Sequence, residues 1–128
     1  MSLPAGNVLI VEDDPDLLEI LATLLTAEGF HSVSAEDGLE AIHLLRAVRH
    51  RAPGVPCLVL LDLNMPRFSG SAFRSTQLAD PNLANVPVVV MSGVADIEQQ
   101  ASALGATASI TKPVDFDALL AIVRRHCA

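Results

Sequence analysis

Apolar residues gather in five short runs along the chain, and each run is followed by a segment with apolar positions at helical spacing. Residues 57–61 and 86–91 contain no charged residue, and neither do residues 7–11. Unbroken apolar runs of this length are typical of strands that are buried on both faces of a sheet. Residues 30–35 and 108–111 mix polar and apolar positions, which predicts strands at the two edges of the same sheet.

Helix boundaries are marked between these runs. Asp14 and Pro15 suit the N-cap and first turn of one helix, and Gly29 suits its C-terminal end. Asp96 and Asp115 are expected to begin the fourth and fifth helices. The apolar residues expected on the buried faces of the second, fourth and fifth helices are Leu39, Ile42 and Leu45; Ile97, Ala101 and Leu104; and Phe116, Leu119, Leu120 and Val123.

The chain therefore alternates strand and helix five times, which predicts an α/β fold with a parallel sheet and helices on both faces. Right-handed crossovers and three central strands lead to the strand order 2-1-3-4-5 of a doubly wound, flavodoxin-like (βα)5 domain. A length of 128 residues suits one domain. We expect this domain to cover residues 7–126, after a flexible tail at residues 1–6.

Composition narrows the possible partners and the compartment. The net charge of −7 argues against a surface that binds nucleic acid directly, and no apolar stretch is long enough to span a membrane. The first residues lack the basic and apolar regions of a signal peptide. Cys57 lies in a buried run and Cys127 is the penultimate residue, so we expect two unpaired thiols in a reducing compartment, the cytoplasm.

Charged and hydroxyl side chains follow four of the five predicted strands. Glu12 and Asp13 come after the first strand, Asp62 after the third, Ser92 after the fourth and Lys112 after the fifth. The carboxyl ends of parallel strands meet at one edge of a sheet, and a crevice forms where the strand order reverses. The sequence therefore predicts three carboxylates, one hydroxyl and the single lysine of the chain around that crevice.

This group of side chains fits phosphoryl chemistry. Three carboxylates in close contact repel one another, and oxygen ligands with few protein contacts favour Mg²⁺, which often bridges to phosphate. A lysine on the far side offers a compact positive charge to a phosphate oxygen. An aspartate is then available as a nucleophile that forms an acyl phosphate.

Four motifs at these strand ends resemble the receiver domains of bacterial response regulators, a CheY-like family of two-component signalling. They are V-E-D-D-P after the first strand, L-L-D-L-N-M-P-x-x-x-G around Asp62, M-S-G after the fourth strand and K-P after the fifth. The resemblance extends over nearly the whole chain, about residues 7–125. It implies a phosphorylation-dependent switch that catalyses only its own phosphorylation and dephosphorylation and is otherwise not an enzyme.

The resemblance also implies a role for each residue of the crevice. Asp62 is expected to accept the phosphoryl group, Ser92 to hydrogen-bond it and Lys112 to pair with one of its oxygens. The expected Mg²⁺ ligands are Asp13, Asp62, the backbone carbonyl of Asn64 and, through water, Glu12. The expected neighbours of the phosphoryl group are Gly93, Val94 and Pro113, and the Lys112–Pro113 bond is commonly cis in the family.

The resemblance implies partners as well. The expected phosphoryl donor is a histidine kinase or a histidine phosphotransfer protein. The expected output is an effector domain or partner on the face formed by the fourth helix, the fifth strand and the fifth helix. Ser109 stands where receivers often carry an aromatic residue, three positions before the lysine, so the readout on this face is expected to differ.

Three other functions fit the residues less well. A phosphohydrolase similar to the haloacid dehalogenase family needs a second Asp two residues after the nucleophile, where this chain has Asn64. A nucleotide-binding Rossmann domain needs a glycine-rich turn after the first strand, and this chain lacks one. A receiver-like interaction module that works without phosphorylation stays open as the alternative, although the acidic, Ser and Lys positions argue against it.

Overall fold

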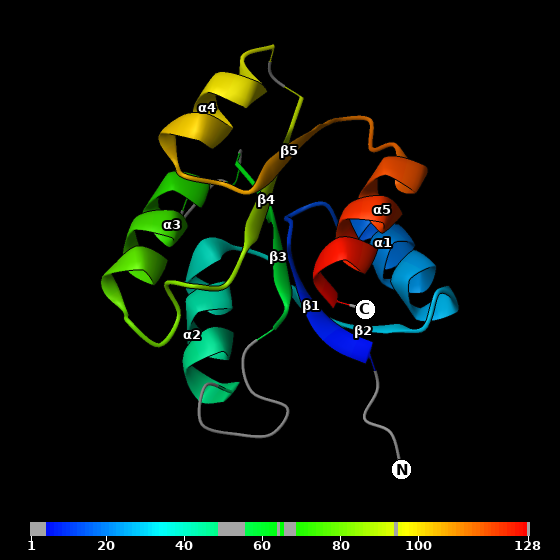
Figure 1. Ribbon diagram of the computed structural model, residues 1–128, viewed down its shortest axis with the longest axis horizontal. Coiled ribbons are helices and arrows are strands. Elements are labelled where there is room, and N and C mark those ends of the chain that lie inside the picture. The colour runs from blue at the N-terminus through cyan, green and yellow to red at the C-terminus, as the bar shows by residue number, and fades with distance from the viewer. Residues whose placement is uncertain (1–4, 49–55, 64, 66–68, 94, 128) are drawn as a thin grey trace.

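The computed structural model describes residues 5–48, 56–63, 65, 69–93 and 95–127. Strands and helices alternate along them, and five parallel strands pair in the order β2-β1-β3-β4-β5 (Figure 1). The strand order predicted from the sequence is confirmed. The elements are β1 (Ala5–Val11), α1 (Pro15–Ala27), β2 (Phe30–Ala35), α2 (Gly38–Val48), β3 (Leu58–Asp62), α3 (Gly70–Ala79), β4 (Val88–Ser92), α4 (Ile97–Ala103), β5 (Ala108–Thr111) and α5 (Phe116–Cys127).

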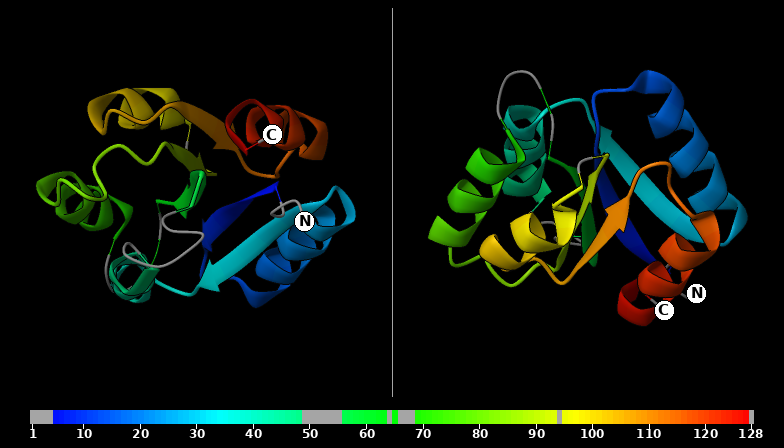
Figure 2. Two further views of the ribbon diagram at one scale, coloured as in Figure 1. Left: turned by 60° about the horizontal axis from the view of Figure 1, so that its bottom comes forward. Right: turned by 90° about the horizontal axis from the view of Figure 1, so that it is seen from above.

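Helices cover both faces of the sheet and enclose two separate cores. α1 and α5 lie on one face, and α2, α3 and α4 lie on the other (Figures 1 and 2). Successive residues of a strand point to opposite faces. Val8 and Ile10 of β1 therefore pack in the core beneath α1 and α5, whereas Leu9 and Val11 pack in the core beneath the other three helices.

Two of the three central strands, β3 and β4, are buried along their whole lengths, whereas the edge strands β2 and β5 include exposed residues. The predicted division between central and edge strands is confirmed. Asp62 and Ser92 are the last residues of β3 and β4. The buried strands therefore bring these two polar side chains to the carboxyl edge of the sheet.

Local signals set the helix ends. Asp14 caps α1 by accepting hydrogen bonds from two backbone N–H groups at 3.0 and 3.4 Å, and Asp115 caps α5 in the same way at 3.0 and 3.2 Å. Gly29 follows α1 with a φ of +88°, a left-handed conformation that favours glycine. Asp96 precedes α4, but its side chain accepts a hydrogen bond from Gln100 Nε2 at 2.9 Å instead of capping the helix backbone. None of the helices in the described ranges is long and apolar enough to cross a membrane.

Three details differ from the sequence-based expectation. β1 begins at Ala5, inside the segment expected to be a tail. Leu39 is 51% exposed, because the buried stripe of α2 is centred on Ile42 and Leu45 and Leu39 lies to its side. Phe116 is 39% exposed, because it is the first residue of α5 and lies one turn before the buried part of that helix.

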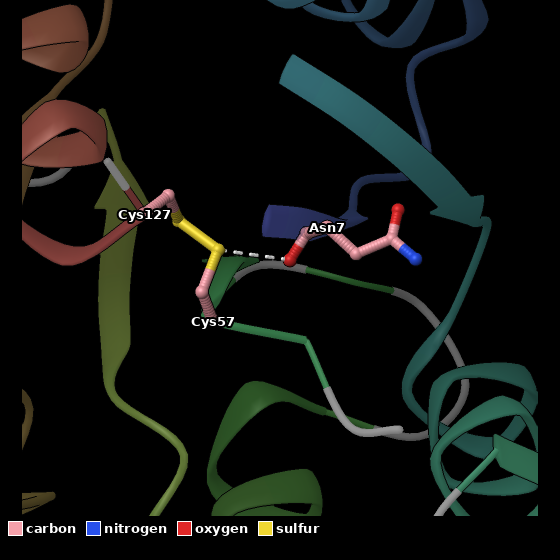
Figure 3. Close-up of a disulfide and its surroundings, with 3 residues drawn as sticks. All are labelled: Asn7, Cys57 and Cys127. Atoms are coloured by element: carbon pink, nitrogen blue, oxygen red, sulfur yellow. Dashed lines mark hydrogen bonds between the residues drawn. A yellow bond between two sulfur atoms is a disulfide. The ribbon is translucent and has the colours of Figure 1, made fainter. Parts of the chain in front are cut away.

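The prediction of two unpaired thiols was wrong. Cys57 and Cys127 form a disulfide with Cα atoms 5.4 Å apart (Figure 3), a separation within the usual range for this bond. Cys57 is only half-buried and lies immediately before β3, and Cys127 is the last residue of α5. The two positions are 70 residues apart in sequence, and they meet because α5 runs back along the sheet toward the amino end of β3 (Figure 1).

Candidate functional site

Four charged side chains come together at the carboxyl edge of the sheet, and Ser92 ends the strand beside that of Asp62. Glu12 and Asp13 follow β1, Asp62 and Ser92 end β3 and β4, and Lys112 follows β5. The N–H of Lys112 donates a hydrogen bond to the Ser92 carbonyl at 2.9 Å. This backbone bond continues the pairing of β4 and β5 by one residue and directs the lysine toward the carboxylates.

Three carboxylates form the negative part of the site. One oxygen from each of Glu12, Asp13 and Asp62 lies within 4.8 Å of the other two. Glu12 is fully buried and Asp62 is 2% exposed, whereas Asp13 is exposed. The cluster is therefore open to solvent on the Asp13 side and enclosed by protein behind Glu12.

Lys112 supplies positive charge to the same cluster. Its Nζ lies 2.6 Å from Glu12 Oε1 and 3.5 Å from Asp62 Oδ2. Burial acts to lower the pKa of Lys112, but the hydrogen bond to Glu12 and the negative charges of Asp62 and Glu12 outweigh this effect and raise the pKa above its ordinary value. The ammonium group is therefore charged at neutral pH and bridges two of the three carboxylates.

Glu12 is the most perturbed acid of the site. Its pKa is raised to about 7, first because burial disfavours the charged form and second because the Asp62 carboxyl lies beside it. Lys112 acts in the opposite direction, and so does the N–H of Asp14, which donates to Glu12 Oε2 at 3.2 Å. Both oxygens of Glu12 thus have protein partners, which favours contact with a metal through water over direct coordination.

The structure also places the residues expected around a phosphoryl group. Ser92 is fully buried at the end of β4. Gly93 is exposed, and a side-chain carbon added there would meet, among the described residues other than its chain neighbours, no atom within 4 Å. The Lys112–Pro113 peptide bond is cis, as the family resemblance implied. The space beside Gly93 is therefore open for a ligand to approach the end of β4.

Two expected site residues, Asn64 and Val94, lie outside the described residues, so their roles stay predictions. Ser109 lies in β5, where it pairs in register with Val90 of β4 and is half-buried. The position at which receivers often carry an aromatic ring thus holds a small polar side chain in this protein.

Gly70 has a positioning role that the sequence reasoning did not assign. A Cβ atom at Gly70 would lie 2.9 Å from Leu63 Cδ2, 3.0 Å from Leu63 Cα and 3.1 Å from the carbonyl oxygen of Asp62. Glycine therefore lets the first turn of α3 approach the backbone of Asp62 and Leu63 closely. The sequence feature that could have indicated this role is the place of Gly70 at the end of the motif L-L-D-L-N-M-P-x-x-x-G, which fixes its spacing from Asp62 along the chain.

The donor set fits a small, hard divalent cation. Three carboxylates face a single ammonium group, so the cluster carries an excess of negative charge that a cation would neutralise. Every side-chain donor in the cluster is oxygen, and few protein oxygens are available, which is the arrangement that Mg²⁺ prefers. The acidic cluster is therefore typical of a Mg²⁺ site.

Comparisons with known proteins agree with this arrangement. The response regulator receiver domain family matches residues 8–124. The chain is 33% identical over 126 residues to protein Rrf1 of Nitratidesulfovibrio vulgaris, a match that covers 98% of this chain and 85% of Rrf1. It is 35% identical over 122 residues to the transcriptional regulatory protein GlrR of Escherichia coli, which covers 93% of this chain and 26% of GlrR. The chemotaxis response regulator CheY4 of Vibrio cholerae shares the fold with a TM-score of 0.82 at 24% identity, covering 94% of this chain and 98% of CheY4.

The chain belongs to the response regulator receiver domain family. Its members are signalling modules of two-component systems and not catalytic enzymes in their own right, and such a system implies a histidine kinase partner. The acidic cluster of Glu12, Asp13 and Asp62 is consistent with the phosphoacceptor site of this family. The chain spans most of Rrf1 but only about a quarter of GlrR.

Proposed function

We propose that this protein is a phosphorylation-dependent switch in which Asp62 accepts a phosphoryl group from a histidine kinase or a histidine phosphotransfer protein. The observation that carries the proposal is the placement of Lys112 Nζ, 2.6 Å from Glu12 Oε1 and 3.5 Å from Asp62 Oδ2. A phosphoryl group brings additional negative charge and strong acceptor oxygens. A lysine already held beside the acceptor carboxylate can stabilise that charge as it develops.

Asp62 is the best placed nucleophile of the three acids. Glu12 is buried, both of its oxygens accept hydrogen bonds, and its pKa of about 7 leaves it partly protonated at neutral pH. Asp13 is exposed on the solvent side of the cluster. Asp62 is held by a buried strand, and Lys112 approaches one of its oxygens. In the transfer, an oxygen of Asp62 bonds to phosphorus while the bond from phosphorus to the histidine nitrogen of the donor breaks.

Mg²⁺ is the proposed cofactor of this transfer. The residues proposed to hold it are Asp13 and Asp62 through their carboxylates, Asn64 through its backbone carbonyl, and Glu12 through water. When bound, the ion neutralises negative charge between the carboxylates and the phosphoryl oxygens. Without the cation, the negative charge of the neighbouring carboxyl groups is not neutralised, and we expect this charge to repel an incoming phosphoryl group from Asp62.

The remaining residues are proposed to hold the phosphoryl group once it is on Asp62. Lys112 is proposed to exchange its contact with Glu12 for a contact with a phosphoryl oxygen, and the hydroxyl of Ser92 is proposed to donate a hydrogen bond to another. Gly93 has open space beside it and is proposed to admit the group. Val94 and Pro113 are proposed as flanking neighbours.

The output is proposed to be a change in partner or effector-domain binding on the face formed by α4, β5 and α5. The segment after Ser92 leads into α4, and Lys112 joins β5 to α5, so both phosphoryl-binding residues are covalently connected to this face. With a serine at position 109, we propose that these two connections carry the signal in place of an aromatic side chain. Membership of the receiver family supports action in the cytoplasm, and the net charge of −7 supports a protein partner over nucleic acid.

The test is the intact mass of the protein after incubation with acetyl phosphate and Mg²⁺. We expect wild-type protein to gain one phosphoryl group, and we expect the gain to disappear in Asp62→Asn and after treatment with EDTA. Asp117→Asn changes an exposed acid in the first turn of α5 and is the matched control, which should gain the group normally. No gain in wild type, or an equal gain in Asp62→Asn, would reject the proposal and favour an interaction module that works without phosphorylation.

A further inference from the structure

We propose that Cys57 and Cys127 form a reversible thiol–disulfide site that exchanges with small thiols of the glutathione class, and that its redox state controls how firmly the carboxyl end of α5 is held to the sheet. The site lies at the amino edge of the sheet, away from the acidic cluster. Cys57 precedes Asp62 by five residues of extended strand, a span of about 16 Å. A change at the disulfide therefore acts on α5 without touching the phosphoryl site.

The disulfide joins the last residue of α5 to the residue before β3, and β1 supports the junction (Figure 3). The N–H of Cys57 donates a hydrogen bond to the Asn7 carbonyl at 2.9 Å, which fixes Cys57 against β1. The same turn of α5 is also linked to the residue after α1 by an exposed ion pair, in which Arg124 Nη2 lies 2.8 Å from Glu28 Oε2. An exposed ion pair contributes little, so this end of α5 is held chiefly by the disulfide and by the packing of buried Val123 in the core.

The surroundings of both sulfur atoms suit free thiols as well as a disulfide. A sulfur atom in a disulfide carries no hydrogen, but the Asn7 carbonyl oxygen lies 3.1 Å from Cys57 Sγ. A Cys57 thiol would therefore find an acceptor already in place. Cys127 is 8% exposed and belongs to the aliphatic core beneath α1 and α5, where a thiol packs as a small apolar group. Neither sulfur loses a required partner when the bond opens.

Cys57 is half-buried whereas Cys127 is buried, so the attack of a small thiol is assigned to the Cys57 sulfur. In reduction, one glutathione thiolate attacks Cys57 Sγ, the protein disulfide breaks and Cys127 leaves as a thiolate that takes up a proton. A second glutathione then releases the Cys57 thiol, and the two electrons come from two glutathione molecules that become one glutathione disulfide. Oxidation by glutathione disulfide is the reverse sequence.

The proposed location of a receiver domain adds a reason to expect reversibility, and this step rests on the function proposed above. In a reducing cytoplasm, disulfides are usually transient and redox-sensing. The two largely aliphatic cores of this domain also bury so much apolar surface that we expect the fold to form without a covalent link. The bond therefore serves better as a switch than as a structural support.

The test is a redox titration of the native protein in mixtures of reduced and oxidised glutathione. Samples are quenched in acid, unfolded, alkylated and weighed by intact mass, while circular dichroism follows the fold. We expect both cysteines to change state together, reversibly, with native circular dichroism at both ends. A disulfide that opens only when the protein unfolds would overturn the proposal, and so would thiols that never pair.

Hydrogen exchange provides the readout of α5 itself. Reduction is expected to speed exchange of the last-turn amides, residues 124–127, by about tenfold through local opening, whereas amides of β4 should change only as far as the global stability falls. The Cys57→Ala/Cys127→Ala variant should match the reduced protein and ignore the redox buffer. If this variant does not fold, the comparison of oxidised and reduced wild-type protein still tests the proposal. Equal exchange rates of the last-turn amides in these two states would refute redox control of α5. Asp62→Asn protein should titrate like wild type, so a failure of this proposal is separate from a failure of the phosphorylation proposal.

Discussion

Glu12 is the residue on which the charge balance of the acidic site depends. It is fully buried, lies 2.6 Å from Lys112 Nζ and has a pKa raised to about 7. A carboxyl group in this state changes its charge near neutral pH, between a neutral form that suits the metal-free site and a charged form that suits a nearby cation. The protonation of Glu12 should therefore be visible in the pH dependence of stability.

We predict that metal-free wild-type protein loses stability relative to Glu12→Gln as the pH rises from about 5 to about 8.5. The pKa of Glu12 in the folded protein, about 7, exceeds its ordinary value of 4.5. Folding thus favours the protonated form, and this contribution is complete below the ordinary pKa and is lost as the pH rises through the folded value. We expect a relative loss on the order of 2–3 kcal/mol, from urea unfolding at each pH. Parallel pH profiles for the two proteins would contradict this assignment.

At the scale of elements, α3 is fixed to its neighbours at two places, and both bear on the geometry of the site. Gly70 at its start approaches the backbone after β3, and Arg74 one turn later reaches the end of α4. The first contact holds the segment that follows Asp62. The second holds the carboxyl end of a helix on the proposed output face.

Gly70→Ala is expected to destabilise the protein by about 1–3 kcal/mol. The new Cβ would lie 3.0 Å from Leu63 Cα and 3.1 Å from the Asp62 carbonyl oxygen, so backbone atoms would have to move. Gly93→Ala is the matched control, because a Cβ there meets no atom within 4 Å in the part of the chain that the structure describes, its chain neighbours aside. Thermal and urea unfolding of both variants would test the prediction, and equal stability of the two would show that the close approach of α3 is not required.

Arg74→Met should lower the free energy of unfolding by about 2–4 kcal/mol. Arg74 is 8% exposed, and its guanidinium donates to the carbonyls of Leu104 and Gly105 and to Gln77 Oε1, each at 2.9 Å. The substitution leaves the buried Gln77 Oε1 and the less buried carbonyls of Leu104 and Gly105 without this donor. Arg125→Met, at an exposed position of α5, is the control. A loss of unfolding free energy no larger than that of the control would show that Arg74 does not stabilise the end of α4.

Local sequence patterns were sufficient to predict most of the elements. Apolar runs identified the strands, and the mixed pattern of β2 and β5 placed them at the edges, because burial on both faces excludes polar residues from central strands. Asp14 and Gly29 marked the ends of α1 through their own backbone preferences. The acidic site was predictable for a related reason, since the carboxyl ends of parallel strands share one edge of the sheet.

Features that depend on contacts between distant segments were not predictable in the same way. The Cys57–Cys127 disulfide depends on where α5 ends relative to β3, and helical spacing alone does not give this position. The role of Gly70 depends on the distance between α3 and the backbone of Leu63. The exposure of Leu39 depends on how α2 is rotated on the sheet. Each of these features follows from packing, which a single sequence records only indirectly.

At the scale of the whole molecule, the two edges of the sheet carry different chemistry. The carboxyl edge holds the acidic cluster with Lys112, and the amino edge holds the disulfide (Figure 3). α5 extends between these two edges, since Lys112 lies before its first turn and Cys127 ends it. Both sites can therefore act on the same helix.

Reduction of the disulfide is expected to lower the stability of the whole domain by about 2–4 kcal/mol, because the bond restricts the unfolded chain between two residues 70 positions apart. Urea unfolding with and without reductant measures this difference. The Cys57→Ala/Cys127→Ala variant should not respond to reductant. Identical midpoints for oxidised and reduced wild type would show that the bond contributes nothing to global stability.

The identity of the phosphoacceptor is tested most directly by chemical trapping. After incubation with acetyl phosphate and Mg²⁺, borohydride reduces an aspartyl phosphate to an alcohol, and peptide mass spectrometry locates the altered residue. We predict reduction at Asp62 and at no other acid, because Asp62 ends a buried strand with Lys112 Nζ 3.5 Å from its Oδ2. Reduction at Asp13 or Glu12, or no reduction in protein that binds Mg²⁺, would contradict the assignment of Asp62 as the residue that switches this protein.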